Sequence, residues 1–212
     1  KHGVKIMESL IKNIIAMRLK ATPHDIRHGV EWYAQAQQNC RDIAESHDMP
    51  LRVVVGVVSA LSPNNKWTRN IANANDLIGA FMNGDAMESV KVSTYNTMKL
   101  KAWHILESMP MNCDIIKAML NGQKIIAFYE CIMDQDSCCI DGHARNIAYN
   151  ERIGLTDDRT NIGKREYKEL VQAYVAASKR CTIMDNGKRR RLKPYELQAI
   201  TWTVWRKQWG IV

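Results

Sequence analysis

Hydrophobic residues recur along most of the chain at the three- and four-residue spacing of amphipathic helices. Residues 4–19 form the first such stretch. Thr22-Pro23-His24-Asp25 then combines a capping hydroxyl with proline in the first turn, which predicts a helix to about residue 46. The same pattern predicts later helices over residues 66–82, 95–108, 112–120, 123–133, 142–150 and 164–180, with a last helix that opens at Pro194.

Two segments lack a clear period. The apolar run from Val53 to Leu61 fits either a strand or a buried helix, and its helical surroundings favour the helix. The segment from Asp185 to Lys193 is polar and basic, and we expect a loop there. No internal repeat is visible. Many short helices in succession predict an all-α fold.

The size and charge of the chain bound its class. Its 212 residues suit one domain or two small lobes that share a core. No stretch reaches the roughly 20 apolar residues that span a membrane and no secretory signal is visible, so we expect a soluble cytoplasmic protein. Thirty Lys and Arg against 22 Asp and Glu leave a net charge of +8. That excess favours nucleic acid as a partner, although a generic basic protein has the same charge.

The six cysteines follow neither a disulfide pattern nor a metal-site pattern. None belongs to a CxxC pair, and the adjacent Cys138 and Cys139 cannot easily bridge each other. We therefore expect reduced thiols, with Cys138 and Cys139 as small buried residues, and no metal site.

One aspartate stands where chemistry is possible. Asp141 opens a predicted helix directly after a loop, in the segment Ile140-Asp141-Gly142-His143. A carboxylate at a helix start accepts backbone N–H bonds and is favoured by the helix dipole. Beside a DNA sugar it would stabilise positive charge at C1′ as a base departs, or activate a nucleophile. The alternative is an aspartate that only caps its helix.

A lysine occupies a similar place upstream. Lys124 follows Gly122 and Gln123 at the start of another predicted helix. Its amine is able to attack C1′ and form a Schiff base, and Gly122 would let the backbone approach a phosphate closely. The alternative for Lys124 is an ordinary surface lysine.

Four segments in order carry a family resemblance: Val58-Ser59-Ala60-Leu61-Ser62 with Asn70 downstream, Tyr95-Asn96 with Lys99 and Lys101, Gly122-Gln123-Lys124, and Ile140-Asp141-Gly142-His143. Together they resemble the helix-hairpin-helix (HhH-GPD) DNA glycosylase superfamily, of the endonuclease III and adenine-glycosylase type. The resemblance covers roughly residues 50–150. It implies a two-lobed all-α fold in which Asp141 is the catalytic aspartate and Lys124 the Schiff-base lysine.

The chain also departs from that family. Its hairpin reads Ala118-Met119-Leu120-Asn121-Gly122 and keeps only the last glycine, and Leu61 or Asn64 stands in for the glutamine that fills the gap behind a flipped base. The cysteines of the endonuclease III iron–sulfur cluster are missing, so we expect no cluster. These departures point to a divergent branch. The segments at residues 61–70, 122–129, 140–144 and 198–206 resemble phage-encoded relatives of the superfamily, which would act in the host cytoplasm. The alpha-glutamyl/putrescinyl thymine pyrophosphorylases, which modify a base without releasing it, are an alternative within that branch.

Further residues are candidates for a base pocket or for DNA contacts. The alternatives are a core position for Trp67 and Asn70, a solvated face for Lys99, Lys101 and Arg69, a structural role for His143, and a mobile loop for the run from Lys188. Helical spacing makes Trp202, Trp205 and Trp209 expected core residues. The DNA-binding or pocket candidates are Gly122, Gln123, Asn64, Asn65, Trp67, Asn70, Tyr95, Asn96, Lys99, His143, Arg145, Lys188, Arg189 and Arg190.

The sequence therefore predicts a helix-hairpin-helix glycosylase-like unit over residues 1–212. One lobe is expected at about residues 50–120, and the other from residues 1–49 with 121–212, with an active cleft between them. The expected function is cleavage of a damaged or modified base from DNA with an abasic-site lyase step. A base-modifying transferase and a non-catalytic DNA-binding protein remain open, and no protein partner is indicated.

Overall fold

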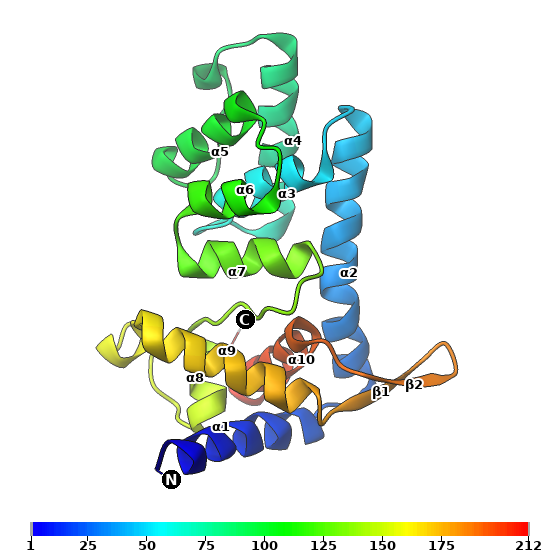
Figure 1. The fold of residues 1–212 in the computed structure, drawn as a ribbon, viewed down its shortest axis with the longest axis vertical. Helices are drawn as coiled ribbons and strands as arrows, with labels where there is room; N and C mark the ends of the chain where they lie inside the picture. Colours follow the sequence, from blue (N-terminus) through cyan, green and yellow to red (C-terminus); the bar gives the residue numbers. More distant parts are fainter. Residues whose placement is uncertain (1, 212) are drawn as a thin grey trace. The chain divides into compact units, whose positions relative to one another are not determined.

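The computed structural model describes residues 2–211, and most of them are helical (Figure 1). In chain order the α-helices are α1 (His2–Leu19), α2 (Pro23–Ser46), α3 (Leu51–Ala60), α4 (Trp67–Asn83), α5 (Asn96–Ser108), α6 (Cys113–Leu120), α7 (Gln123–Ile132), α8 (Gly142–Tyr149), α9 (Lys164–Ser178) and α10 (Pro194–Gln208). The remaining elements are the 3₁₀ turns η1 (Met87–Ser89) and η2 (Asp158–Thr160) and the strands β1 (Thr182–Asp185) and β2 (Lys188–Arg191). The all-α class expected from the sequence is confirmed at this level.

The chain folds as two units. The first comprises the residues up to Ala34 together with those from Asp134 onward, and the second comprises Gln35–Met133. The lobe expected over residues 50–120 lies inside the second unit, which also takes in residues 35–49 and 121–133. The sequence boundaries were drawn at turns, whereas the division follows packing. The buried side chains in the second half of α2 belong to the second unit, and α7 packs against α3.

The second unit is built around α3. Every residue from Val53 to Ala60 is buried, because α4, α5, α6 and α7 all pack against this one helix (Figure 1). A helix that is covered on all sides is apolar on all sides, which explains why its sequence shows no helical period. The expectation of a helix rather than a strand is confirmed.

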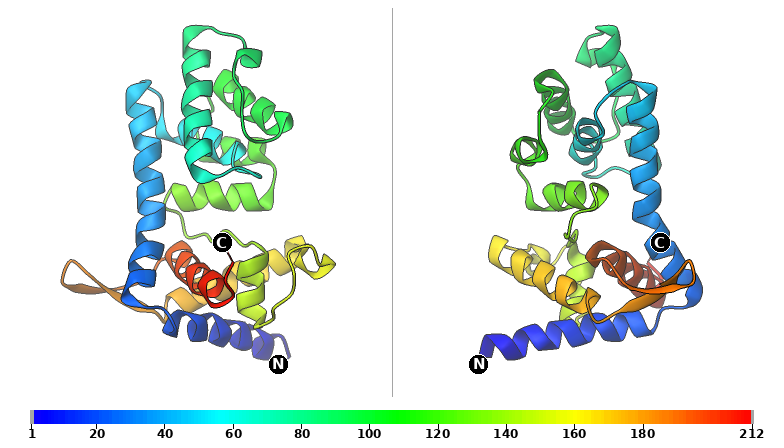
Figure 2. Two further views of the ribbon diagram at one scale, coloured as in Figure 1. Left: turned by 180° about the vertical axis from the view of Figure 1, so that it is seen from behind. Right: turned by 45° about the vertical axis from the view of Figure 1, so that its right-hand side comes forward.

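The first unit packs α1, α8, α9 and α10 around a shared core (Figure 2). The Tyr174 hydroxyl on α9 donates to the Ala144 carbonyl of α8 at 3.1 Å, and the Asn13 amide on α1 donates to the Ala148 carbonyl at 2.8 Å. The predicted start of α2 is also confirmed. The Asp25 carboxylate accepts from the Thr22 N–H at 2.9 Å, and the Asp25 N–H donates to the Thr22 hydroxyl at 3.2 Å.

The loop expected over residues 185–193 is wrong in part, because it contains strand β2. β1 and β2 form an antiparallel hairpin that is joined by Asn186 and Gly187. Both turn residues have positive φ, 48° and 77°, as a type I′ turn requires. An Asn-Gly pair between short strands is the strongest local hairpin signal, and here the charge of the flanking residues obscured it.

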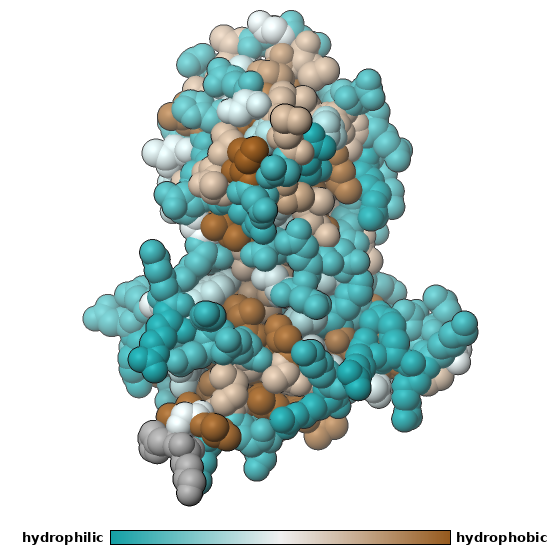
Figure 3. Space-filling view, in the orientation of Figure 1, coloured by the Kyte–Doolittle hydropathy of each residue, from teal (hydrophilic) through white to brown (hydrophobic). Residues whose placement is uncertain are grey.

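The surface and the thiols complete this description. Polar side chains cover much of the face shown in Figure 3, with apolar side chains scattered between them. Within residues 2–211 there is no helix with both the length and the apolar character that crossing a membrane requires. All six cysteines are free thiols; Cys138 is buried as expected, whereas Cys139 is only half-buried. Burial raises the pKa of Cys40 to about 12, so this thiol is a packing group.

Candidate active site

Asp141 is the N-cap of α8, as the sequence predicts. Its backbone is extended, with φ −109° and ψ −177°, and its Oδ1 accepts from the Ala144 N–H at 2.8 Å. The carboxylate therefore meets the positive end of the helix dipole. The residue as a whole is half-buried.

The second carboxylate oxygen has a partner from the far end of the chain. Asp141 Oδ2 accepts from the indole Nε1–H of Trp202, on α10, at 3.1 Å. A cap needs only one oxygen, so this bond goes beyond capping and fixes the rotation of the carboxylate. Both donors are neutral N–H groups, so the negative charge of the carboxylate is oriented but not neutralised.

An aromatic ring and a cation contact Trp202 in the first unit. The His143 ring lies edge-on to the Trp202 indole, with centroids 6.4 Å apart and planes at 75°. The Arg206 guanidinium lies over the Trp202 ring, 4.3 Å from its centroid. Trp202 is half-buried, as is His143. The indole that donates to Asp141 therefore contacts both an imidazole ring and a guanidinium.

Buried tyrosines hold the loop that carries Asp141. The Ile140 N–H donates to the Tyr167 hydroxyl at 3.1 Å, and the Tyr174 hydroxyl holds the first turn of α8 through Ala144. Burial raises the pKa of Tyr174 well above its usual value, so this hydroxyl remains a hydrogen-bond donor. A Cβ at Gly142 would come within 2.6 Å of the Leu155 side chain, so the start of α8 is also closely packed against the following loop.

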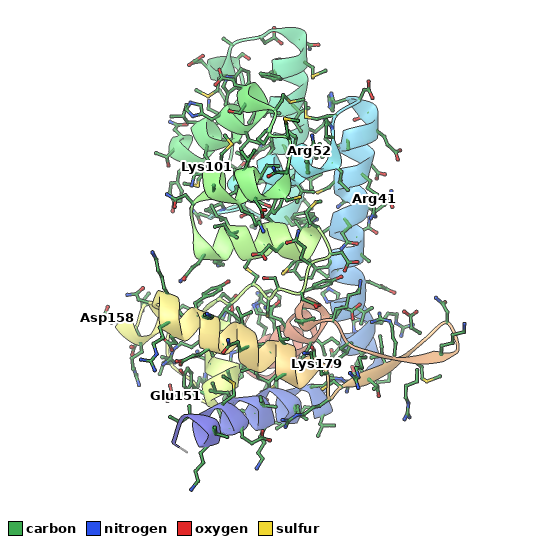
Figure 4. The ribbon with its side chains drawn as sticks, in the orientation of Figure 1. Arg41, Arg52, Lys101, Glu151, Asp158 and Lys179 are labelled. Carbon is green, nitrogen blue, oxygen red and sulfur yellow. The ribbon has the colours of Figure 1, made fainter. Side chains whose placement is uncertain are left out.

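Arg145 was predicted as a DNA contact, and the structure gives it another role. The residue is 8% exposed, and its guanidinium donates to Glu166 at 3.1 Å and to Glu151 at 3.2 Å (Figure 4 labels Glu151). It also lies over the Tyr149 ring at 4.5 Å. A buried guanidinium held by two carboxylates stabilises α8 and is not available to a phosphate.

The second unit carries the other catalytic candidate. Asn121 ends α6 in the left-handed region with φ 47°, Gly122 begins α7 in extended backbone with φ −158°, and Lys124 lies exposed in the first turn of α7 next to exposed Gln123. Gly122 therefore does not need glycine for its φ. A Cβ there would meet Ile125 Cγ1 at 3.2 Å, so close packing is what favours a small residue.

The segment before α4 divides between surface and core. Asn64 is exposed with φ 49°, and the Asn65 amide donates to the Leu61 carbonyl at 3.0 Å. Asn70 is 1% exposed and its amide donates to the Val58 carbonyl at 3.1 Å, which is the core position given above as the alternative. Trp67 is half-buried, edge-on to Phe128 at 6.1 Å.

The first turns of α5 carry two more candidates at the surface and two lysines in structural roles. Tyr95 is 56% exposed, and Asn96 is exposed as the first residue of α5. Lys99 donates to the Val90 carbonyl at 2.9 Å, and Lys101 donates to the Leu120 carbonyl at the end of α6 (Figure 4). Both ammonium groups bind backbone carbonyls of neighbouring segments. These contacts explain the two lysines without a role in binding phosphate.

The structure thus brings Asp141 and His143 together in the first unit, whereas Lys124, Gly122, Gln123, Asn64, Asn65, Trp67, Tyr95 and Asn96 lie in the second. Sequence reasoning missed Trp202, which it assigned to the core. Trp205 is buried, 3% exposed, but Trp202 and Trp209 are half-buried. Helical spacing finds the face of α10 but does not reveal which indole N–H has a polar partner. Residues 2–211 contain no group of three or more His, Cys, Asp or Glu side chains arranged to hold a metal ion.

A family model described as a family of unknown function, DUF7178, matches residues 2–209. The chain belongs to the DUF7178 family. The match extends over both units, so α1 and α10 are as much part of the DUF7178 domain as the central helices. No curated protein and no solved structure matches the chain.

Proposed function

We propose that this protein is a DNA glycosylase with an abasic-site lyase step, in which Asp141 acts on the sugar of a nucleotide that is flipped out of DNA. The observation that carries the proposal is the double orientation of the Asp141 carboxylate, by the Ala144 N–H at 2.8 Å and the Trp202 indole at 3.1 Å. A fixed, charged carboxylate stabilises positive charge without reorganisation at the moment that charge develops.

The chemistry follows from that charge. When the bond between C1′ and a base breaks, the electron pair leaves with the base and positive charge develops on the sugar. A carboxylate beside C1′ lowers the barrier to this step, and a water or an amine then bonds to C1′. With the Lys124 amine as the nucleophile, nitrogen bonds to C1′ and the C1′–O4′ bond of the sugar breaks, with the two amine protons passing to the departed base and to the ring oxygen. The product is a Schiff base with the opened sugar, and loss of a C2′ proton then expels the 3′ phosphate and cleaves the strand.

Two features of the second unit support the same proposal. α6 and α7 are joined by only Asn121 and Gly122, as the two helices of a helix-hairpin-helix motif would be, and Lys124 is exposed in the first turn of α7. The first turn of a helix carries the positive end of the helix dipole, and a DNA phosphate is able to bind at such a helix start. We therefore include the helix-hairpin-helix fold in the proposal.

The test compares wild type with Asp141→Asn on duplexes that bear uracil, oxidised pyrimidines, 5-hydroxymethyluracil, a mismatch or an abasic site. Asparagine caps a helix as well as aspartate does, so Asp141→Asn should keep the fold and DNA binding while base release falls by at least about a hundredfold. Asp157→Asn is the matched control, since Asp157 caps η2 in the same unit by accepting from the Arg159 N–H at 2.9 Å. An equal loss of base release in both variants would show that Asp141 only caps its helix.

The lysine is tested by borohydride trapping. Lys124→Gln should abolish the covalent adduct, whereas Lys91→Gln, an exposed lysine of the same unit, should retain it. Trapping that persists in Lys124→Gln would place the Schiff base on another lysine. Mass spectrometry of the nucleosides separates the alternatives: a changed base that stays on its sugar identifies a base-modifying transferase, and DNA binding with no change at all identifies a non-catalytic binding protein.

A further inference from the structure

The hairpin of the first unit has two unlike faces. In an antiparallel pair, residues opposite each other share a face and successive pairs alternate. Thr182 pairs with Arg191 and Met184 with Arg189, so these four share one face, and all four are exposed, Met184 by 65%. The other face carries Ile183, Asp185, Lys188 and Arg190, and all of these except Lys188 are half-buried.

Arg190 fixes the inner face to the first unit. Its guanidinium donates to Asp185 at 2.6 Å and to the two carboxylate oxygens of Glu196 at 2.8 and 2.9 Å. Glu196 is 4% exposed, so this is a nearly buried anchor at the start of α10. The Leu192 N–H also donates to the Cys181 carbonyl at 3.0 Å and closes the base of the hairpin. The ribbon is therefore held at its base with its outer face in a fixed direction.

The outer face has uncompensated positive charge. It carries the guanidiniums of Arg189 and Arg191 and no acid, because Asp185, the acidic residue of the two strands, lies on the inner face and pairs with Arg190. Within residues 2–211 neither outer arginine forms an ion pair. Exposed Lys188 adds a third cation beside the turn. Figures 1 and 2 show the ribbon extending away from the helices of its own unit.

We propose that this hairpin is a duplex-DNA-binding ribbon, in which Arg189 and Arg191 contact phosphates and Met184 lies against the groove. The inference rests on the proposed function in taking DNA as the partner, and it assigns a surface that the catalytic argument does not use. A two-stranded ribbon fits the DNA major groove, which is about 12 Å wide. Planar guanidiniums suit bidentate contacts to phosphate oxygens. Arg190, predicted from the sequence as a contact, is the anchor instead.

The alternative origin of this charge is protection of a sheet edge, since basic residues on exposed strands discourage edge-to-edge pairing. The test is therefore direct DNA binding. The affinity of Arg189→Gln/Arg191→Gln for a 24-base-pair duplex of mixed sequence is measured at several salt concentrations. Loss of two phosphate contacts should weaken binding at least about tenfold at low salt and make the slope of log affinity against log salt shallower by about 1.8.

The matched control is Arg165→Gln/Lys168→Gln, which removes the same charge from exposed positions of α9 in the same unit. It should bind within about threefold of wild type, because net charge alone acts weakly and at long range. Thermal melting should be unchanged in both double variants, since all four side chains are exposed. An equal loss in the control would assign the effect to net charge and overturn the proposal.

A second readout detects the contact itself. A photo-crosslinking benzophenone residue at Met184 should attach to the duplex, whereas one at Val4, 75% exposed on α1 of the same unit, should not. No duplex binding by wild type, or wild-type affinity of the hairpin variant, would also overturn the proposal. Binding is read apart from turnover. A protein that binds through the hairpin but releases no base would disprove the proposed function and keep this inference, and an active enzyme with a dispensable hairpin would do the reverse.

Discussion

The crossing of α2 and α10 at Gly29 makes the sharpest stability prediction. A Cβ at Gly29 would lie 2.4 Å from the Ile200 Cγ1, 2.7 Å from its backbone N and 2.8 Å from its Cα. Two of these atoms are backbone, so no change of rotamer relieves the overlap and the helices must move apart by about 1 Å. Overpacking of this kind costs about 1–3 kcal/mol, and contact with backbone atoms places Gly29→Ala at the upper end.

Helix propensity works in the opposite direction. Alanine in a helix interior is favoured over glycine by about 1 kcal/mol, so the net loss expected for Gly29→Ala is about 2 kcal/mol. Gly79, in α4, is the matched control, because the nearest atom to its Cβ is His47 Cε1 at an ordinary 3.5 Å. Gly79→Ala should therefore stabilise its unit by about 0.5–1 kcal/mol. The same substitution thus has opposite signs at the two positions.

Urea unfolding followed by circular dichroism measures both variants. The movement of α10 should also displace Trp202, two residues from Ile200, and so lower turnover in Gly29→Ala even at temperatures where the protein is folded. A Gly29→Ala variant as stable as wild type would show that the helices are not in close contact there. Equal destabilisation of Gly79→Ala would refute the steric argument altogether.

Three further perturbations test the first unit. Trp202→Phe keeps the ring but removes the indole donor to Asp141, so the free energy of unfolding should fall by about 1 kcal/mol and turnover by about tenfold, measured by urea melts and base release. Burial alone would raise the pKa of Asp25, but hydrogen bonds from its Thr22 partner and a nearby ammonium outweigh it and the pKa is lowered. A lowered folded pKa stabilises fully above the unfolded value of about 3.9, and this effect is lost as the pH falls from there through the folded pKa. The difference between wild type and Asp25→Asn in melts should therefore be full at pH 7 and disappear only below the lowered pKa. Arg145→Met should destabilise by about 2 kcal/mol, because it leaves two carboxylates without their guanidinium, and an unchanged melting curve would contradict the anchoring role.

Local chemistry was sufficient to predict most helices. The Thr22–Asp25 cap lies within four residues, and its two hydrogen bonds form as the sequence indicates. The nature of α3 required inference from its surroundings, since a helix that is buried on every side shows no period. The sequence analysis did not predict the β1–β2 hairpin, although Asn186-Gly187 is a typical type I′ turn sequence. Its strands are four residues each and too polar to show apolar alternation.

Only those features of the candidate site that depend on neighbouring residues in the sequence were predictable. The cap at Asp141 follows from a carboxylate before a helix, but its bond to Trp202 joins residues 61 positions apart, and no sequence pattern encodes that pairing. Partners that are distant in sequence also explain why positive charge is a poor guide to DNA contacts here. Arg145 and Lys99 are consumed by partners within their own units, which only the packed structure reveals.

Two arginines of the first unit, Arg145 and Arg190, are enclosed by acidic side chains. Arg145 and Arg190 are each held by two carboxylates, with Glu151 and Glu166 for the first and Asp185 and Glu196 for the second. Such pairs contribute no free charge to a partner. The net charge of +8 therefore comes from other positions, and on the outer face of the hairpin Arg189 and Arg191 lie on a ribbon that Arg190 anchors. α10 contacts both proposed functional parts of the first unit. Glu196 at its start binds Arg190, which anchors the hairpin, and Trp202 further along the helix donates to Asp141. A duplex bound to the hairpin would therefore be connected, through Arg190 and Glu196, to the helix that orients Asp141.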